Sequence, residues 1–248
     1  MDEAIATSLD RFTSKHAGSG KLFESALRSL PGGNTRSLLY TAPFPISMHK
    51  GDGYRLWDVD GNEYEPAIFI TAASSILANR LSRYIDLVSE LTAGLFGHSD
   101  PRLQTALTEA IHDIGIHLGA TNPLEQRYAS LICKRFGLDR VRFCNSGTEA
   151  NLHCLAAARA FTKRRKIIAF RGGYHGSVLG FSNGPYPNNV DQQDFILLQY
   201  NDVDGLEQAF SQHQDVAAVI VEAMQGSAGF IPASPEFLEA IRKLSEKV

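Results

Sequence analysis

The sequence predicts an α/β protein in which a mainly parallel sheet is covered by helices on both faces. From residue 141 onward, strand-like segments alternate with helical ones, which is typical of a parallel sheet. Residues 166–170 and 217–221 are almost wholly apolar, as expected for strands that are buried on both faces. Each of these strands runs into a glycine-rich loop. In open parallel sheets, ligands bind beyond the carboxyl ends of the strands.

The segments before residue 141 are predicted from local signals. A short helix over residues 21–30 should end at the stop signal formed by Pro31 and the two glycines after it. Residues 46–64 predict an antiparallel strand pair with Asp60 and Gly61 at its turn. Apolar periodicity predicts two further amphipathic helices, at residues 101–115 and 123–136.

Residues 145–150, with the sequence NSGTEA, form the most informative motif. They lie between a predicted short strand and a predicted helix over residues 151–165. The free N–H groups of a first helical turn, together with the hydroxyls of Ser146 and Thr148, can converge on a phosphate. Gly147 allows a ligand to approach the backbone closely, and the helix dipole favours the negative charge. The alternative is that Ser146 or Thr148 only caps the helix.

Two further loops carry residues suited to a ligand. Residues 171–176 follow the first apolar strand, and their glycines suggest a tight loop that presents the rings of Tyr174 and His175. Either ring could stack on a flat heteroaromatic ligand; the alternative is a turn with a buried tyrosine. Glu222 ends the second apolar strand and precedes a glycine-rich loop, although a lone glutamate there is often only solvated. Three such loops at strand ends together favour a ligand site.

Taken together, these motifs resemble the class III aminotransferases, which are enzymes of fold type I that depend on pyridoxal 5'-phosphate (PLP). The resemblance covers residues 21–64 and 84–248. Within the family, the chain resembles the glutamate-1-semialdehyde aminomutase group, and residues 32–45 resemble the β-amino-acid (β-phenylalanine-type) aminotransferases more closely. The motifs that carry the resemblance are residues 32–36, 57–62, 97–101, 145–151, 173–176 and 221–222.

The resemblance implies roles for five residues at the cofactor. Ser146, Gly147 and Thr148 match the loop that holds the PLP phosphate. Tyr174 matches the aromatic residue that stacks on the pyridine ring, and His175 lies beside it.

Further roles concern the acidic and basic residues. Glu222 matches the acidic residue near the ring face and O3' of the cofactor. Arg36 matches a residue that pairs with the substrate carboxylate, a task suited to its planar fork, although it could be only a solvated loop charge. No catalytic residue is assigned, because the family's Asp for the pyridine nitrogen and its Schiff-base Lys come after the last residues of this chain. Lys243 and Lys247 precede both motifs and do not replace them.

The resemblance implies PLP-dependent amino-group transfer between an amino acid and a keto acid, with a β-amino acid among the candidate substrates. The alternatives are an aminomutase-type isomerase and a catalytically inactive product that lacks the Schiff-base lysine. Full-length members are expected to be homodimers. A nucleotide-binding α/β protein that uses residues 146–148 for phosphate is another interpretation, but the sequence has neither the glycine-rich fingerprint nor the P-loop lysine.

Three regions are predicted along the chain. Residues 1–64 form the N-terminal segment, with a helix and a β-meander that belong to the small domain, and residues 84–248 form an incomplete PLP-binding large domain. Residues 65–83 have no counterpart in the family pattern and are either a real inserted helix or translated non-coding sequence. The flanks join cleanly without them, which favours the second. We also expect residues 219–221 to expose a strand edge, which promotes association.

Composition excludes several classes of function. The net charge of −3 suggests no nucleic-acid partner. The three cysteines have no paired spacing, which fits a reducing compartment and argues against disulfides or a metal site. The first sixteen residues contain no apolar signal core, and the apolar stretch at residues 67–78 is too short to span a bilayer. We therefore predict a cytoplasmic protein with no membrane partner.

Overall fold

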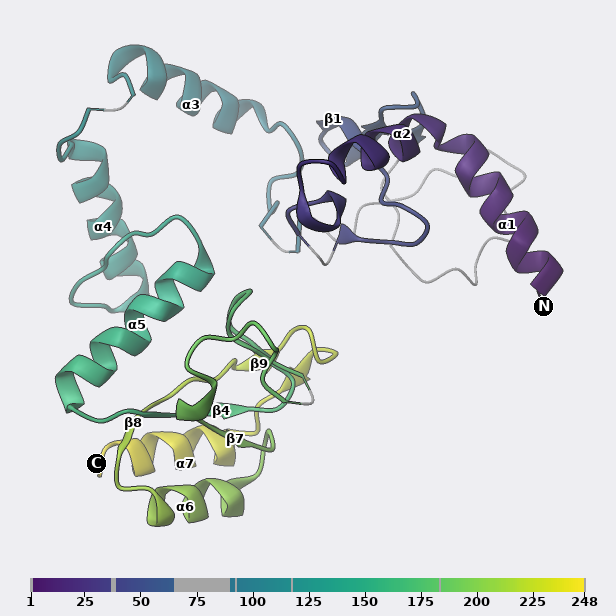
Figure 1. The fold of residues 1–248 in the computed structure, drawn as a ribbon. Coiled ribbons are helices and arrows are strands. Elements are labelled where there is room, and N and C mark those ends of the chain that lie inside the picture. The colour runs from purple at the N-terminus through teal and green to yellow at the C-terminus, as the bar shows by residue number, and fades with distance from the viewer. Residues whose placement is uncertain are drawn as a thin grey trace. The chain divides into compact units, whose positions relative to one another are not determined.

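The computed structural model describes residues 2–36, 39–64, 90–91, 93–116, 118–182 and 184–247 (Figure 1). The chain forms two compact units, Met1–Ala120 and Thr121–Val248. The predicted insertion at residues 65–83 lies outside the described residues, as does the predicted domain boundary at residue 84. Both therefore remain predictions.

The first unit combines helices with a small antiparallel sheet whose strand order is β1-β2-β3. The turn at Asp60 and Gly61 joins β2 to β3, as predicted, and Gly61 has the positive φ of +79° that such a turn requires. A second hairpin at Gly53, between β1 and β2, was not predicted. The elements are α1 (Asp2–Lys15), α2 (Ala17–Ala26), η1 (Pro31–Gly33), β1 (Met48–Asp52), β2 (Arg55–Asp58), β3 (Glu63–Tyr64) and α3 (Pro101–Asp113).

The prediction of a helix over residues 21–30 was wrong at both ends, because α2 begins four residues earlier and ends at Ala26. The cause is a contact from the β-meander. The Asp60 carboxylate accepts hydrogen bonds from the backbone N–H groups of Gly18 and Ser19, at 2.5 and 3.0 Å. These N–H groups belong to the first turn of α2, and N–H groups in a first turn have no acceptor within the helix itself. A distant carboxylate therefore sets the start of this helix.

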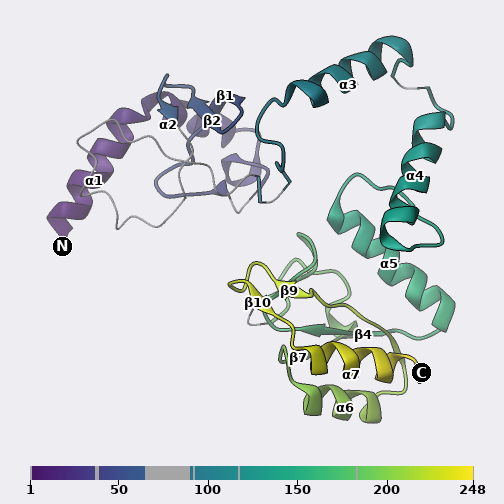
Figure 2. The ribbon, with the colours of Figure 1, turned by 180° about the vertical axis from the view of Figure 1, so that it is seen from behind.

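The second unit is built around a parallel sheet with the strand order β7-β4-β8. Its strands alternate with helices along the chain (Figure 2). The elements are α4 (Pro123–Phe136), α5 (Gly147–Thr162), β4 (Lys166–Phe170), β5 (Gly173–Tyr174), β6 (Gly180–Phe181), η4 (Gln192–Asp194), β7 (Phe195–Leu198), α6 (Val203–Gln212), β8 (Val216–Val219), β9 (Met224–Gln225), β10 (Ile231–Pro232) and α7 (Pro235–Ser245).

Helices cover both faces of this sheet, as the sequence predicted (Figure 1). Side chains of β4 alternate between the two faces because successive residues of a strand point in opposite directions. Ile168 and Phe170 belong to one buried cluster with side chains of α6 and α7. Ile167 and Ala169 belong to a second cluster with Leu155 of α5. The central strand is thus buried on both sides, which explains its continuous apolar sequence.

Three predicted boundaries were wrong in this unit. Residues 141–143 form no strand: the structure shows no ladder partner for them among the described residues, and a strand exists only through pairing. The strand predicted over residues 217–222 is β8, which ends at Val219, so Glu222 lies in the loop beyond it. The helix predicted over residues 151–165 begins earlier, at Gly147, and ends at Thr162.

None of the helices in the described ranges has the length and apolar character that a membrane crossing would require.

Candidate functional site

The start of α5 is both capped and open to an anion. Ser146 is the N-cap residue, and its Oγ accepts the N–H of Glu149 at 3.1 Å. The capping role that the sequence left open is therefore present. The N–H groups of Gly147 and Thr148 nevertheless have no acceptor among the described residues, and a Cβ built on Gly147 would meet no atom within 4 Å. Two free donors therefore lie at the positive end of a helix, with open space beside Gly147.

The glycine-rich loop after β4 lies directly on this helix start. Thr148 Oγ1 accepts the backbone N–H of Ser177 at 3.1 Å. Gly176 has a φ of +132°, and a Cβ at this position would come within 2.8 Å of the Thr148 Cα. The Asn151 side chain donates to the backbone carbonyl of His175 at 2.8 Å. Helix and loop are therefore held together by hydrogen bonds and by an approach that only glycine permits.

The structure presents the ring of Tyr174 and buries that of His175. Tyr174 is 48% exposed, whereas His175 is 8% exposed and packs against Phe181, with ring centroids 6.3 Å apart. The prediction that the loop presents both rings was wrong for His175. Tyr174 ends β5, where consecutive side chains point to opposite sides, so the two rings separate. Burial lowers the pKa of His175, and the nearby Glu222 charge offsets this only in part.

The Glu222 carboxylate connects two loops through their backbones. Its two oxygens accept the N–H of Tyr174 at 3.0 Å and the N–H of Gly226 at 3.2 Å. The Glu222 carbonyl accepts the Tyr200 hydroxyl at 2.7 Å, and burial, followed by the Glu222 charge, raises the pKa of Tyr200. Tyr200 follows β7, Tyr174 follows β4 and Glu222 follows β8. Glu222 therefore connects the segments that follow all three parallel strands. It fixes the backbone that carries the exposed tyrosine ring.

Three residues that support the site were missed by sequence reasoning. Gln225 is 2% exposed, and its Nε2 donates to the carbonyl of Arg171 at 2.8 Å. Asn151 and Tyr200 make the bonds described above. Their partners lie 22 to 54 residues away in the sequence. An amide or hydroxyl side chain near a strand end gives no signal of which distant carbonyl it will bind.

Arg36 lies in the first unit, and the other candidate residues lie in the second. Its guanidinium forms an ion pair with Glu90, and both side chains are more than half exposed. Exposed ion pairs of this kind contribute little stability, so the arginine can change partner at low cost. Its role toward a substrate carboxylate remains a prediction.

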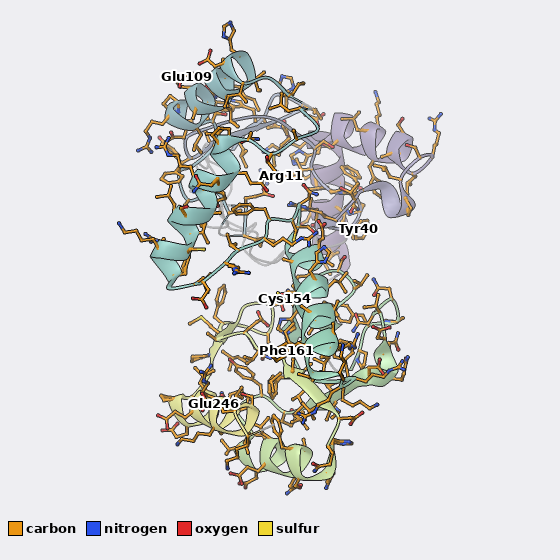
Figure 3. All side chains as sticks on the ribbon, turned by 90° about the vertical axis from the view of Figure 1, so that its left-hand side faces the viewer. Arg11, Tyr40, Glu109, Cys154, Phe161 and Glu246 are labelled. Atoms are coloured by element: carbon orange, nitrogen blue, oxygen red, sulfur yellow. The ribbon has the colours of Figure 1, made fainter. Side chains whose placement is uncertain are left out.

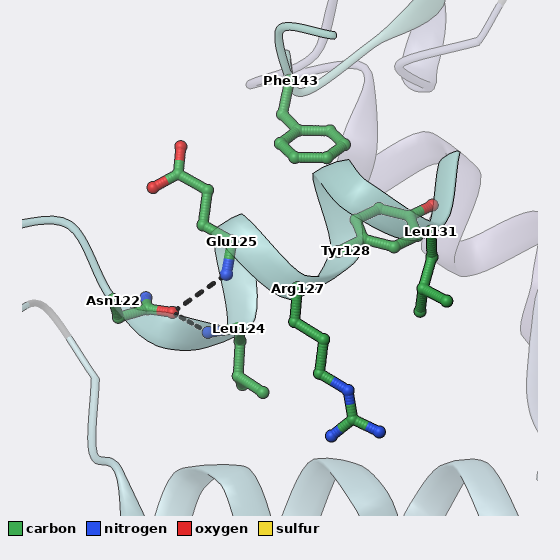
Figure 4. A pocket seen from close by; sticks show the side chains of 7 residues that line it. All are labelled: Asn122, Leu124, Glu125, Arg127, Tyr128, Leu131 and Phe143. Atoms are coloured by element: carbon green, nitrogen blue, oxygen red, sulfur yellow. Dashed lines mark hydrogen bonds between the residues drawn. The ribbon is translucent and has the colours of Figure 1, made fainter. Parts of the chain in front are cut away.

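A pocket of about 630 Å³ lies along α4 and contains none of the predicted site residues (Figure 4). Its lining includes the stacked pair of Tyr128 and Phe143, whose ring centroids are 4.9 Å apart. Asn122, the N-cap of α4, also lines the pocket and accepts the N–H groups of Leu124 and Glu125 (Figure 4). The lining is mostly apolar and lacks the convergent donors that are present at the start of α5.

Comparison with known proteins gives one consistent family. The family model described as "Aminotransferase class-III" matches residues 72–248. A β-phenylalanine transaminase from Variovorax paradoxus is 44% identical over 250 residues, which is 100% of this chain and 52% of the relative. The solved structure of a β-phenylalanine aminotransferase from the same organism has a TM-score of 0.86 and 43% identity, covering 100% of this chain and 53% of the other.

Two further relatives extend the comparison. A glutamate-1-semialdehyde 2,1-aminomutase from Caldicellulosiruptor saccharolyticus is 32% identical over 92% of this chain and 52% of the relative. A solved transaminase with PLP bound has a TM-score of 0.79 and 29% identity, over 94% of this chain and 53% of the other. The chain thus spans about half the length of the relatives it matches.

Proposed function

Because the chain belongs to the class III aminotransferase family, we propose that it binds PLP and takes part in amino-group transfer between an amino acid and a keto acid. One observation carries the proposal: the contact between Thr148 and Ser177 brings an open helix start beside a loop with an exposed tyrosine ring. A phosphate attached to a flat ring requires both features within the length of one small molecule. The similarity to a PLP-bound transaminase structure supports the same cofactor.

The phosphate would be held by the first turn of α5. The free N–H groups of Gly147 and Thr148 would donate to phosphate oxygens, and the helix dipole would add to the attraction. The hydroxyls of Ser146 and Thr148 accept hydrogen bonds from backbone N–H groups, and each retains its own proton to donate. Hydrogen bonds to a charged acceptor contribute about 1.5–3 kcal/mol each, so this turn would provide much of the affinity.

The ring of the cofactor would lie against Tyr174. Glu222 would act as a positioning residue, since its carboxylate holds the Tyr174 backbone and leaves the ring free to stack. The buried imidazole of His175 would support the loop of residues 171–176 by packing against Phe181. When bound, PLP supplies the electron sink that amino-group chemistry needs. Because the Glu222 carboxylate contacts the backbone of Tyr174, it would also lie near the ring face of a cofactor that stacks on Tyr174.

The substrate is proposed to be an amino acid whose carboxylate pairs with Arg36, and the 44% identity to a β-phenylalanine transaminase favours a β-amino acid. A second candidate reaction is the aminomutase isomerisation, supported by the relative at 32% identity. We propose a homodimer as the working form. We assign no catalytic role to Lys243, which is an exposed residue of α7 that pairs with Glu239 at 3.4 Å.

Binding of PLP to the Gly147→Ala variant tests the proposal. The added methyl group would enter the open space at the helix start, and alanine favours a helix, so folding should be unchanged. We expect the Kd for PLP, measured by isothermal titration calorimetry, to rise by about tenfold or more because phosphate hydrogen bonds are lost. The matched control is Gly184→Ala, where a Cβ also meets no atom within 4 Å.

Two outcomes would contradict the proposal. Equal PLP affinity in both variants at unchanged melting temperature would show that the phosphate does not bind at Gly147. Equal binding of pyridoxal without its phosphate to the parent chain would show that the helix start contributes nothing to recognition.

A further inference from the structure

The cysteine before the phosphate motif has two metal-ligating neighbours in space. Cys144, Glu149 and His153 each offer one ligand atom, and these atoms all lie within 4.8 Å of one another. Glu149 and His153 are one turn apart on α5, with His153 Nε2 3.8 Å from Glu149 Oε1. We propose that these three side chains bind a transition-metal ion of the zinc class. The proposal does not depend on the proposed cofactor.

The donor set fits the chemistry of such an ion. Thiolate, imidazole and carboxylate are the ligand types that Zn²⁺ binds, at about 2.0–2.3 Å. In a tetrahedral site these bond lengths place ligand atoms about 3.3–3.8 Å apart. The Glu149–His153 distance already meets this requirement, and His153 is exposed, so its ring can turn toward the sulfur at low cost. Three protein ligands leave the fourth position to water.

The hydrogen bonds of Glu149 prepare it for this role. Its Oε2 accepts the backbone N–H of Asn145 at 2.9 Å, while its Oε1 faces His153. A metal-binding carboxylate is commonly oriented by such a second hydrogen bond, which also limits its freedom before the ion arrives. One oxygen of Glu149 is therefore anchored and the other is available to the metal.

The charge balance also favours a divalent ion. The helix N-terminus carries about half a positive charge, which by itself repels a cation. Cys144 as thiolate and Glu149 as carboxylate bring two negative charges, which outweigh the helix dipole and neutralise the ion. Binding to a thiol releases its proton, so metal affinity should increase with pH.

Titration of the reduced, metal-free 248-residue chain with Co²⁺ tests the site. Co²⁺ occupies zinc sites, and its bond to a thiolate gives a charge-transfer absorption band in the near ultraviolet. We expect this band to saturate at one ion per chain in the parent and to be absent in Cys144→Ser. The matched control is Cys154→Ser, which removes an exposed cysteine of α5 and should keep the band (Figure 3).

The other two ligands are tested with substitutions that spare the fold. In Glu149→Gln the amide oxygen can still accept the Asn145 N–H, so the helix start stays intact while the charge is lost. Both Glu149→Gln and His153→Asn should weaken Co²⁺ binding by about tenfold or more. A band that persists in Cys144→Ser, or that disappears equally in Cys154→Ser, would show binding to surface thiols alone and overturn the proposal. Unchanged affinity in both ligand variants, with unchanged circular dichroism, would also overturn it.

Discussion

Two parts of the second unit carry amphipathic helices that differ in what their apolar faces contact. On α6 and α7, the apolar side chains Leu206, Phe210 and Phe237 are at most 8% exposed and pack on the central strand of the sheet. On α4 no side chain is buried. Four large apolar side chains of α4 keep 46–63% of their surface exposed: Leu124, Tyr128, Leu131 and Phe136.

The difference shows that an apolar stripe determines that a helix forms, whereas burial depends on a second surface. Both helix types begin at side-chain caps, Asn122 for α4 and Asp202 for α6. Of these two helices, α6 packs its apolar side chains on the sheet, whereas α4 buries no side chain among the described residues. Because the free energy of folding comes mainly from buried apolar area, α4 and α6 should contribute very differently to stability.

The largest expected effect is at Phe237. This side chain is fully buried, and its ring lies 5.0 Å from that of Phe170 and 5.4 Å from that of Tyr200. Phe237→Ala should lower the free energy of unfolding by about 3–5 kcal/mol, through lost burial and the cavity left behind. Leu131→Ala on α4 is the matched comparison and should cost less than about 0.5 kcal/mol. Urea unfolding followed by circular dichroism measures both values.

If the two variants lose similar stability, α4 must be buried in solution and the comparison fails. A loss at Leu131 alone would show that the cooperative core of this unit lies elsewhere.

A pH series on His175 should show the next largest effect. Burial lowers the pKa of His175 from 6.5 in the folded state, so below about pH 6.5 the unfolded chain binds a proton that the folded chain resists. The free energy of unfolding should therefore be constant above this pH and fall as the pH drops toward the folded pKa. His175→Asn should flatten this slope, because the group whose pKa differs between the folded and unfolded states is removed.

Urea denaturation at several pH values between about 5 and 8 gives the slope. His16 of the first unit also has a pKa lowered by burial, so some slope should remain in His175→Asn. A parent chain whose stability does not depend on pH in this range would contradict the buried placement of His175.

Removing the two helix caps should give a smaller and unequal effect. Asp202→Ala deletes the acceptor of the Gly205 N–H at the start of α6 and should cost about 1 kcal/mol of global stability. Asn122→Ala deletes the equivalent cap of α4 but should mainly fray that helix locally. Hydrogen exchange separates the cases, since only Asp202→Ala should reduce protection of the sheet amides. Equal loss of sheet protection in both variants would argue against separate behaviour of α4.

The smallest expected effect is the absence of PLP labelling at two lysines, one in α7 and one just after its end. Lys243 is 71% exposed and pairs with Glu239 at 3.4 Å, and we assign Lys243 and Lys247 no role in catalysis. Treatment with PLP followed by borohydride should leave both unlabelled at one equivalent of cofactor, as mass spectrometry of peptides would show. Selective labelling of either residue would require a reassignment of the site.

The sequence by itself determined the elements whose signals are local. The apolar run of β4, the amphipathic helix α4 and the Gly61 turn each depend on signals within a few residues, so periodicity and turn chemistry located them. The NSGTEA motif likewise placed a helix start where an anion can bind. The ordered set of motifs indicated the class III family, which the family model confirmed.

Only the tertiary structure decided which distant groups meet. Glu222 holds a backbone N–H that lies 48 residues earlier in the sequence, Asp60 sets the start of α2, and His175 is buried while its neighbour Tyr174 is exposed. Cys144 gained metal-ligating neighbours although its spacing to other cysteines predicted none. The Glu222 and Asp60 contacts depend on chain closure over tens of residues, where composition and periodicity carry no information about the partner. Hydrogen-bond satisfaction and burial select the partner of each group once the sheet and its helices have assembled.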